Sequence, residues 1–118
     1  MKRIYVAGAY SAPTVVQMLE NMQRGIRLAA QVQAAGHAPY CPWSDCLIHF
    51  QGMDTLDLER CYAVALAWLE VSHAVLVQPV GAGQSLGTSR ELARADELGI
   101  PVFYSLEGLL SWANSTPA

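Results

Sequence analysis

The sequence is short of charge, of cysteine and of long hydrophobic runs, and each shortage excludes a class of protein. Of the 118 residues 14% are charged, the net charge is -3, and the seven Lys and Arg side chains form no cluster. Such a surface does not capture polymeric nucleic acid by broad electrostatic attraction. Each hydrophobic run is too short for a membrane-spanning helix, and the apolar residues that follow Met1 are too few for a signal peptide. We therefore expect a cytoplasmic protein with no membrane partner.

The cysteines do not suggest a disulfide framework. Cys41, Cys46 and Cys61 are three in number, so they cannot all pair within one chain, and reduced thiols are the simplest interpretation. His37 and His49 flank the first two cysteines and could be read with them as a zinc set. The spacing of the cysteines is, however, a weak match to zinc motifs. We predict no metal and no cofactor.

Hydrophobic residues, by contrast, make up 53% of the chain. A chain of this length forms one domain with a substantial core. We assign residues 1–113 to that domain and residues 114–118 to a polar tail. Because so few charged residues cover the surface, some apolar surface should be buried by a partner, most simply a second copy of the chain. The sequence thus predicts a homodimer, with its contacts on the first two helices.

Hydrophobic periodicity predicts strands that alternate with helices. Short apolar runs indicate strands at residues 3–9, 38–41, 74–78 and 102–104, and amphipathic stretches, two of them closed by glycine, indicate helices at 13–35, 57–71, 86–98 and 106–112. This alternation is typical of an α/β fold with a parallel sheet and right-handed crossovers. We predict a flavodoxin-like or Rossmann-like sandwich. Its sheet has four or five strands, in the spatial order 2-1-3-4, with helices on both faces.

Ligands of such sheets bind beyond the carboxyl ends of the strands, where the strand order reverses. Three predicted turns open on that edge, and the second is long enough to suggest a functional loop in so small a domain. The first turn contains Gly8, Tyr10 and Ser11, the second contains Asp45, His49 and Asp54, and the third is the glycine-rich stretch 81–87.

The third turn joins an apolar strand to a helix and carries the strongest functional signal. With Gly81, Gly83, Ser85 and Gly87, it leaves backbone N–H groups at the start of a helix, where the helix dipole favours an anion such as a phosphate. Glu91 follows about one turn inside that helix. We take Glu91 as the candidate chemical residue, beside a candidate anion site.

Three segments of the chain point to one family. They read Arg-Ile-Tyr-Val-Ala-Gly at 3–8, Ser-Leu-Gly-Thr-Ser-Arg-Glu at 85–91 and Leu-Gly-Ile-Pro at 98–101. In combination they resemble the nucleoside 2-deoxyribosyltransferase superfamily, which includes the 2'-deoxynucleoside 5'-phosphate N-hydrolases. The similarity covers nearly the whole chain in order and spacing.

The resemblance implies a role for each of three residues. Members of that superfamily cleave an N-glycosidic bond with a glutamate at the position of Glu91, which attacks C1' of the sugar. A tyrosine at the position of Tyr5 orients the glutamate or the sugar, and a serine at the position of Ser85 holds the 5'-phosphate in the nucleotide-cleaving branch. A helix carboxylate is also a chemically suitable nucleophile for an oxocarbenium-like carbon. The implied ligand is a small nucleoside or nucleotide.

The chain departs from the family pattern at an acidic position. The family usually has an aspartate about eight residues before the third strand, and this chain has Ala65 there, while the aspartate common at the start of that strand is His73. Loss of one acid–base group typically slows a reaction by ~10²–10⁴. His73 would lie about 15 Å from the crevice, too far to substitute. Asp45, His49 and Asp54 lie on the correct edge and are the candidate substitute acids.

Two functions therefore remain open. The first is an N-glycosidase or deoxyribosyltransferase, or, with a larger pocket, an enzyme that hydrolyses the nicotinamide bond of a dinucleotide. The second is a catalytically weakened protein that binds a nucleotide or an ADP-ribose-like ligand, which the alanine at position 65 favours. Trp43, Trp68 and Trp112 are expected in the core or at a dimer contact, and His37 and His73 are expected to be structural or surface residues.

Overall fold

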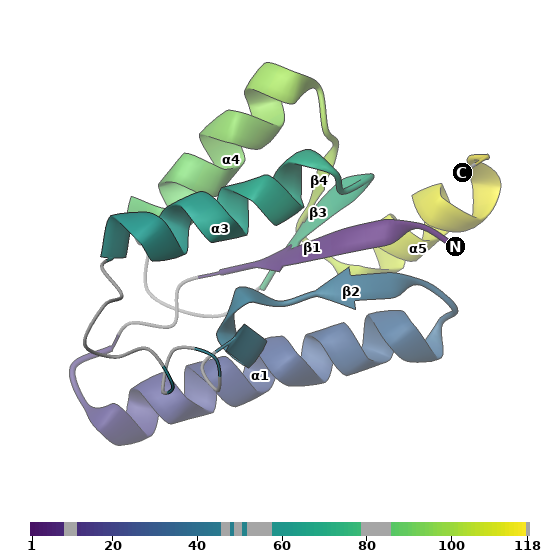
Figure 1. Cartoon of the computed structure of the whole chain (residues 1–118). Helices are drawn as coiled ribbons and strands as arrows, with labels where there is room; N and C mark the ends of the chain where they lie inside the picture. The colour runs from purple at the N-terminus through teal and green to yellow at the C-terminus, as the bar shows by residue number, and fades with distance from the viewer. Residues whose placement is uncertain (9–11, 46–47, 49–50, 52–57, 79–85, 118) are drawn as a thin grey trace.

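In the computed structural model, a parallel sheet lies between two layers of helices (Figure 1). The structure describes residues 1–8, 12–45, 48, 51, 58–78 and 86–117. In this part of the chain the strands are β1 (Arg3–Ala7), β2 (Ala38–Tyr40), β3 (Ala74–Val77) and β4 (Val102–Phe103). The helices are α1 (Val15–Ala34), α3 (Leu58–Glu70), α4 (Leu86–Leu98) and α5 (Leu106–Ser115), with a 3₁₀ turn, η1 (Pro42–Asp45), after β2.

The strand order is β2-β1-β3-β4 with every pair parallel, which confirms the predicted α/β fold and its order. In the register of the sheet, Tyr5 on the central strand β1 lies beside Tyr40 on β2 and beside Val75 on β3. The chain leaves β1 toward one edge of the sheet and leaves β3 toward the other, so the strand order reverses between β1 and β3. That switch point is where α/β sheets of this kind bind ligands.

The helix boundaries agree with the predictions to within a few residues, and the differences lie at the ends. The hydroxyl of Thr14 accepts a hydrogen bond from the backbone N–H of Gln17 and so caps α1, while Ser105 caps α5 in the same way. β1 ends two residues earlier than predicted, at Ala7. α5 ends three residues later than predicted, at Ser115, so part of the predicted polar tail is helical.

The two faces of the sheet bury different sets of residues, as alternation along β1 predicts. One face packs Tyr5 and Ala7 against α3 and α4, and the other packs Ile4 and Val6 against α1, η1 and α5. Both faces are therefore covered by helices. None of the helices in the described part of the chain is both long and apolar enough to cross a membrane.

The start of α1 is more exposed than its apolar sequence suggests. Val15, Val16 and Leu19 are exposed, whereas Gly25 and Val32 are buried. A helix of 20 residues is about 30 Å long, but a strand of five residues spans only about 17 Å. The first turns of α1 therefore extend beyond the sheet (Figure 1). An apolar stripe that reads as a core surface in the sequence is thus partly solvent-facing in this chain.

Two histidines are structural, as predicted, and both lie at the amino end of the sheet. The Nδ1 atoms of His37 and His73 accept hydrogen bonds from the backbone N–H groups of Lys2 and Arg3, respectively. With Nδ1 accepting, the ring proton of His37 is on Nε2, which faces Asn114 Oδ1 at 3.1 Å. Both rings therefore anchor the start of β1, far from the carboxyl ends of the strands.

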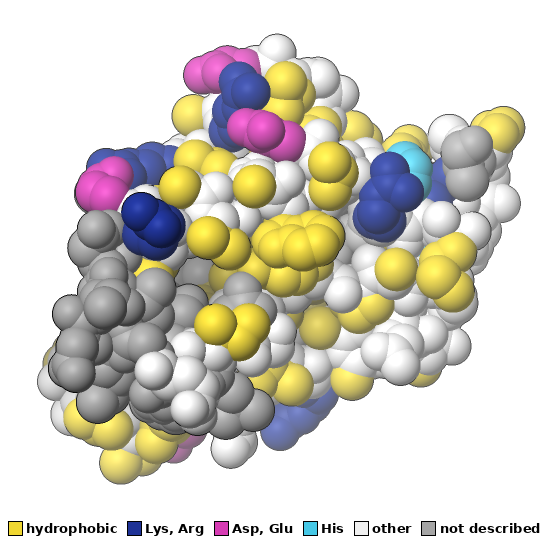
Figure 2. All heavy atoms as spheres, viewed as in Figure 1, with side chains coloured by type: hydrophobic (Ala, Val, Ile, Leu, Met, Phe, Trp, Pro, Cys, Tyr) yellow, Lys and Arg dark blue, Asp and Glu magenta, His cyan; other side chains and the backbone are white. Residues whose placement is uncertain are grey.

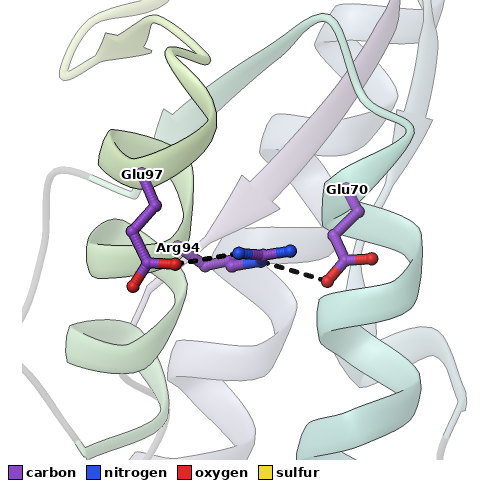
Figure 3. A network of polar contacts seen from close by, with 3 residues as sticks. All are labelled: Glu70, Arg94 and Glu97. Carbon is purple, nitrogen blue, oxygen red and sulfur yellow. Dashed lines mark hydrogen bonds and ion pairs between the residues drawn. The ribbon is translucent and has the colours of Figure 1, made fainter.

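Two arginines of α4 tie this helix to α3. Arg94 bridges Glu70 of α3 and Glu97 of its own helix, with N–O distances of 3.1 and 2.8 Å (Figure 3). Nearer the start of α4, both terminal nitrogens of Arg90 contact the Glu59 carboxylate of α3. These exposed ion pairs set how the two helices lie beside each other, and each contributes little to the stability of the fold.

Candidate functional site

The described part of the site is centred on a hydrogen bond between residues 86 positions apart in the sequence. The hydroxyl of Tyr5, on the central strand, donates to Oε1 of Glu91, on α4, over 2.8 Å. The first turns of α1, α3 and α4 and the carboxyl ends of β1 and β2 all lie on one side of the molecule, the left in Figure 1. The bond uses one of the two carboxylate oxygens, so Glu91 is held in place while its second oxygen lies outside this contact.

Burial shifts the ionisation of both partners. Removal from water raises the pKa of the Glu91 carboxyl from its ordinary value of 4.5 to about 7, and the hydrogen bond from Tyr5 partly opposes this rise. Burial and the nearby Glu91 charge raise the pKa of the Tyr5 phenol, so Tyr5 stays protonated and acts as the donor. A carboxyl group that titrates near neutral pH is suited to chemistry and unusual on a helix surface.

Tyr5 is held by a series of aromatic contacts. It is completely buried, and its ring lies 5.6 Å from the ring of Tyr40, its neighbour on β2. Tyr40 in turn stacks on Trp68 of α3, with ring centroids 5.5 Å apart and planes at 27°. Trp68 is 53% exposed, and hydrophobic side chains gather over α3 on this face (Figure 2). Tyr5 is thus both a core residue, through its buried ring, and a partner of Glu91, through its hydroxyl.

The alanine that departs from the family pattern lies close to this pair. Ala65 of α3 is buried in the hydrophobic cluster that contains Tyr5 and Ala7. A carboxylate at position 65 would therefore point toward the face of the sheet that carries Tyr5 and Glu91. In this chain a methyl group occupies that place. His73, by contrast, is bound to Arg3 at the opposite end of the sheet and does not substitute for the missing acid.

A second set of residues lies on the other side of the β1–β3 switch point. Gln78 follows β3 and is 5% exposed, and its backbone N–H donates to the carbonyl of Ala7 over 2.7 Å. A Cβ built on Gly8 would lie 2.8 Å from the Gln78 Cβ and 3.5 Å from Cη2 of Trp43. Trp43 is buried against Gly25 of α1. It is a core residue, as predicted, and it borders the end of β1.

The structure brings together part of the predicted site. Tyr5 and Glu91 are in contact, Gly8 lies at the carboxyl end of β1, and Gly87 lies in the first turn of α4. Asp45 ends η1, and its side chain is outside the described residues. The remaining predicted site residues are also outside the described residues: Tyr10, Ser11, His49, Asp54, Gly81, Gly83 and Ser85.

Sequence reasoning missed Tyr40 and Gln78. Tyr40 stands beside Tyr5 only because of the β1–β2 register, and a single sequence does not fix that register. Gln78 had a readable signal, because a polar side chain directly after four buried strand residues, at a carboxyl end, is placed to meet a ligand. Thr88, which is 2% exposed and one turn before Glu91, was likewise not singled out.

Comparison with known proteins does not identify the chain. It matches no protein-family model, and none of the curated proteins is detectably similar to it in sequence. The likeness to the deoxyribosyltransferase superfamily therefore rests on the three sequence segments at 3–8, 85–91 and 98–101.

Proposed function

We propose that this chain cleaves or transfers the N-glycosidic bond of a nucleoside or nucleoside 5'-monophosphate, with Glu91 as the nucleophile. The observation that carries the proposal is the part-buried 2.8 Å hydrogen bond from the Tyr5 hydroxyl to the Glu91 carboxyl, which joins the central strand to α4. A carboxylate held by a phenol is a suitable nucleophile for an anomeric carbon. The glycine-rich stretch before α4 supplies the candidate phosphate site by sequence.

The reaction runs in two steps. The Glu91 carboxylate forms a bond to C1' as the bond from C1' to the base nitrogen breaks, and the base departs with the electron pair and takes a proton. Water, or the nitrogen of a second base, then displaces Glu91 and regenerates the carboxylate. By sequence, Asp45, His49 and Asp54 are the candidates for the proton transfer that an aspartate at position 65 would otherwise assist.

Base release from a panel of nucleosides and nucleotides, followed by chromatography, tests the proposal. Glu91→Gln keeps the size of the side chain and removes the attacking charge, so turnover should fall by orders of magnitude while ligand binding survives. Ser85→Ala should instead weaken the binding of phosphorylated ligands alone, by about 1–3 kcal/mol. No detectable base release by the parent, or full activity of Glu91→Gln, would contradict the enzymatic function.

A binding protein is the second candidate function, and Ala65 is the observation that favours it. Its methyl group packs with Tyr5 where the family pattern calls for a carboxylate. In this case the chain binds a nucleotide or an ADP-ribose-like ligand beside Tyr5 and Glu91 without turnover. A thermal-shift screen of the same panel would then detect stabilisation with no base release, since a ligand at a hundred times its Kd adds about 2.7 kcal/mol.

The homodimer predicted from the sequence is part of this proposal. Exposed apolar residues lie on both of the helices concerned: Val15, Val16, Leu19 and Ile26 on α1, and Val64 and Trp68 on α3, with Val71 directly after it. Burial of such surface by a second copy would stabilise the pair. Sedimentation at micromolar concentration should give about twice the chain mass of 12.8 kDa. A single species at the mass of one chain would contradict the dimer.

A further inference from the structure

The side-chain oxygen of Gln78 is a buried acceptor that none of the described residues satisfies. Its amide nitrogen donates to the backbone carbonyl of Asn21 on α1 over 3.3 Å. Because that carbonyl can only accept, the orientation of the amide is fixed, and Oε1 is the atom left without a donor. Buried polar atoms nearly always have a partner, so each exception calls for a physical explanation.

The location of this acceptor argues for a ligand. Gln78 directly follows β3 and is bonded through its N–H to Ala7, the last residue of β1. It therefore stands at the β1–β3 switch point, where parallel α/β sheets bind their ligands. Its side chain points to the face of α1, whereas Tyr5 and Glu91 occupy the face of α3 and α4. The two groups flank the switch point from opposite sides.

Gly8 packs closely against Gln78 at the end of β1. A Cβ at position 8 would lie 2.8 Å from the Gln78 Cβ, closer than side chains tolerate, and 3.5 Å from Oε1. A side chain at this position would thus both displace Gln78 and cover its oxygen. Trp43 borders the same space, with Cη2 3.5 Å from the Cβ position. The end of β1 therefore places a buried, unpaired acceptor beside an aromatic ring, where a donor group of a ligand bound at the switch point would meet it.

We infer that Gln78 is a specificity-determining residue whose Oε1 accepts a hydrogen bond from a neutral donor group of the ligand, a sugar hydroxyl or a base amino group. This inference rests on the proposed function and deepens it. A carbonyl-type oxygen repels a phosphate, so Gln78 binds the part of the ligand opposite to the anion. Ligands that lack the donor are discriminated against, because binding them leaves the acceptor buried and unpaired.

Gln78→Leu tests the inference, with Gln23→Leu on the exposed side of α1 as the matched control. Leucine retains the bulk and removes both the orphan acceptor and the 3.3 Å bond from the amide nitrogen to Asn21, so the two effects oppose each other and the ligand-free variant should melt close to the parent. Its affinity for the nucleoside 5'-monophosphate that the parent binds best should fall about tenfold, as expected for one lost hydrogen bond. Gln23→Leu should leave that affinity unchanged.

Ligand analogues identify the donor. The parent and Gln78→Leu are titrated with the full nucleotide, with its analogue lacking the sugar hydroxyls, and with its analogue lacking the exocyclic amino group. For the analogue that lacks the true donor, the parent should bind more weakly than it binds the full nucleotide, whereas Gln78→Leu should bind the two ligands equally. The group missing from that analogue is the one that Oε1 binds.

Three results would overturn the inference, and they differ from one another. Equal affinity of parent and Gln78→Leu for every ligand would remove the role of Gln78 and leave the proposed function intact. A ligand-free Gln78→Leu that melts below the parent by more than the loss of the single bond to Asn21 accounts for would show that Oε1 has a structural partner, such as a buried water. A parent that binds no nucleoside or nucleotide of the panel would refute the proposed function together with this inference.

Discussion

Tyr40 stacks on Trp68 with ring centroids 5.5 Å apart, and Tyr40 also contacts Tyr5, whose hydroxyl binds Glu91. A half-exposed tryptophan on α3 is thus connected by contacts to the buried carboxyl of α4. The edge strand β2 is only three residues long, and the stacked pair covers its end. The contacts of Tyr40 with Tyr5 and with Trp68 therefore help to hold Tyr5 in position to bind Glu91.

Trp68→Ala should destabilise the chain although the side chain is half exposed. An aromatic pair contributes about 0.5–1.5 kcal/mol beyond the area that it buries, so we expect a loss of about 1–2 kcal/mol in the free energy of unfolding, measured by urea denaturation. Leu98→Ala, at an exposed apolar position at the end of α4 and outside the proposed dimer contact, is the control and should stay within about 0.5 kcal/mol of the parent. Equal losses in the two variants would show that the stack does not support the fold.

The activity of the parent should depend on pH through Glu91. With a pKa of about 7, the Glu91 carboxylate that we propose as the nucleophile forms only as the pH rises. The value of kcat/KM should therefore rise about tenfold per pH unit below neutrality and level off above it. Tyr5→Phe removes the hydrogen bond that favours the carboxylate, so the pKa of Glu91 should rise further and the profile should move to higher pH. Tyr104→Phe, at an exposed tyrosine, should leave the profile in place.

The same shift predicts a pH dependence of stability that needs no substrate. The pKa of Glu91 is about 7 in the folded chain and near 4.5 in the unfolded chain. Between these values the folded state keeps a proton that the unfolded state has lost, so the free energy of unfolding should decrease as the pH rises through this window. Glu91→Gln should abolish that decrease, and denaturation of both proteins at pH 5 and pH 8 measures the difference. A parallel decrease in the two proteins would assign it to other groups.

Ala65→Asp should increase base release if the missing acid limits the reaction. The new carboxyl would enter the buried cluster that contains Tyr5, at the position where the pattern that the sequence resembles has aspartate. Restoring an acid–base group can raise the rate by ~10²–10⁴. Ala65→Asn, of the same shape but unable to exchange a proton, is the control. If both variants were equally slow and both still bound ligand, the binding-protein function would gain support.

Gly25→Ala should destabilise the chain, contrary to the usual effect of alanine in a helix. Alanine normally stabilises a helix interior by about 0.5–1 kcal/mol relative to glycine. Here the added Cβ would lie 1.6 Å from Cζ3 of Trp43, so the ring must move, at a cost of about 1–3 kcal/mol or more. The double variant Gly25→Ala with Trp43→Leu should recover part of the loss, since leucine leaves room for the methyl group. A stabilised Gly25→Ala would show that Trp43 does not need this contact.

The sequence by itself determined the class of fold and the strand order. Apolar runs alternating with amphipathic ones leave few arrangements when crossovers are right-handed, and the order 2-1-3-4 followed. The alternation of side chains between the two faces of β1 was also predictable. So was the structural or surface location of His37 and His73, because both precede strands and lie away from the carboxyl ends. Glu91 was singled out from the sequence because a carboxyl group at the start of a helix after a glycine-rich turn stands out locally, and its chemical role stays a prediction.

Only the tertiary structure decided how these residues meet. The contact between Tyr5 and Glu91 depends on the packing of α4 against β1, and the position of Tyr40 depends on a register that one shift would reverse. The burial that raises the pKa of Glu91 is likewise a property of the packed cluster around it. The unpaired oxygen of Gln78 exists because Asn21 fixes the orientation of the amide and none of the described residues donates to the buried Oε1. These are long-range contacts, and local sequence patterns carry no information about them.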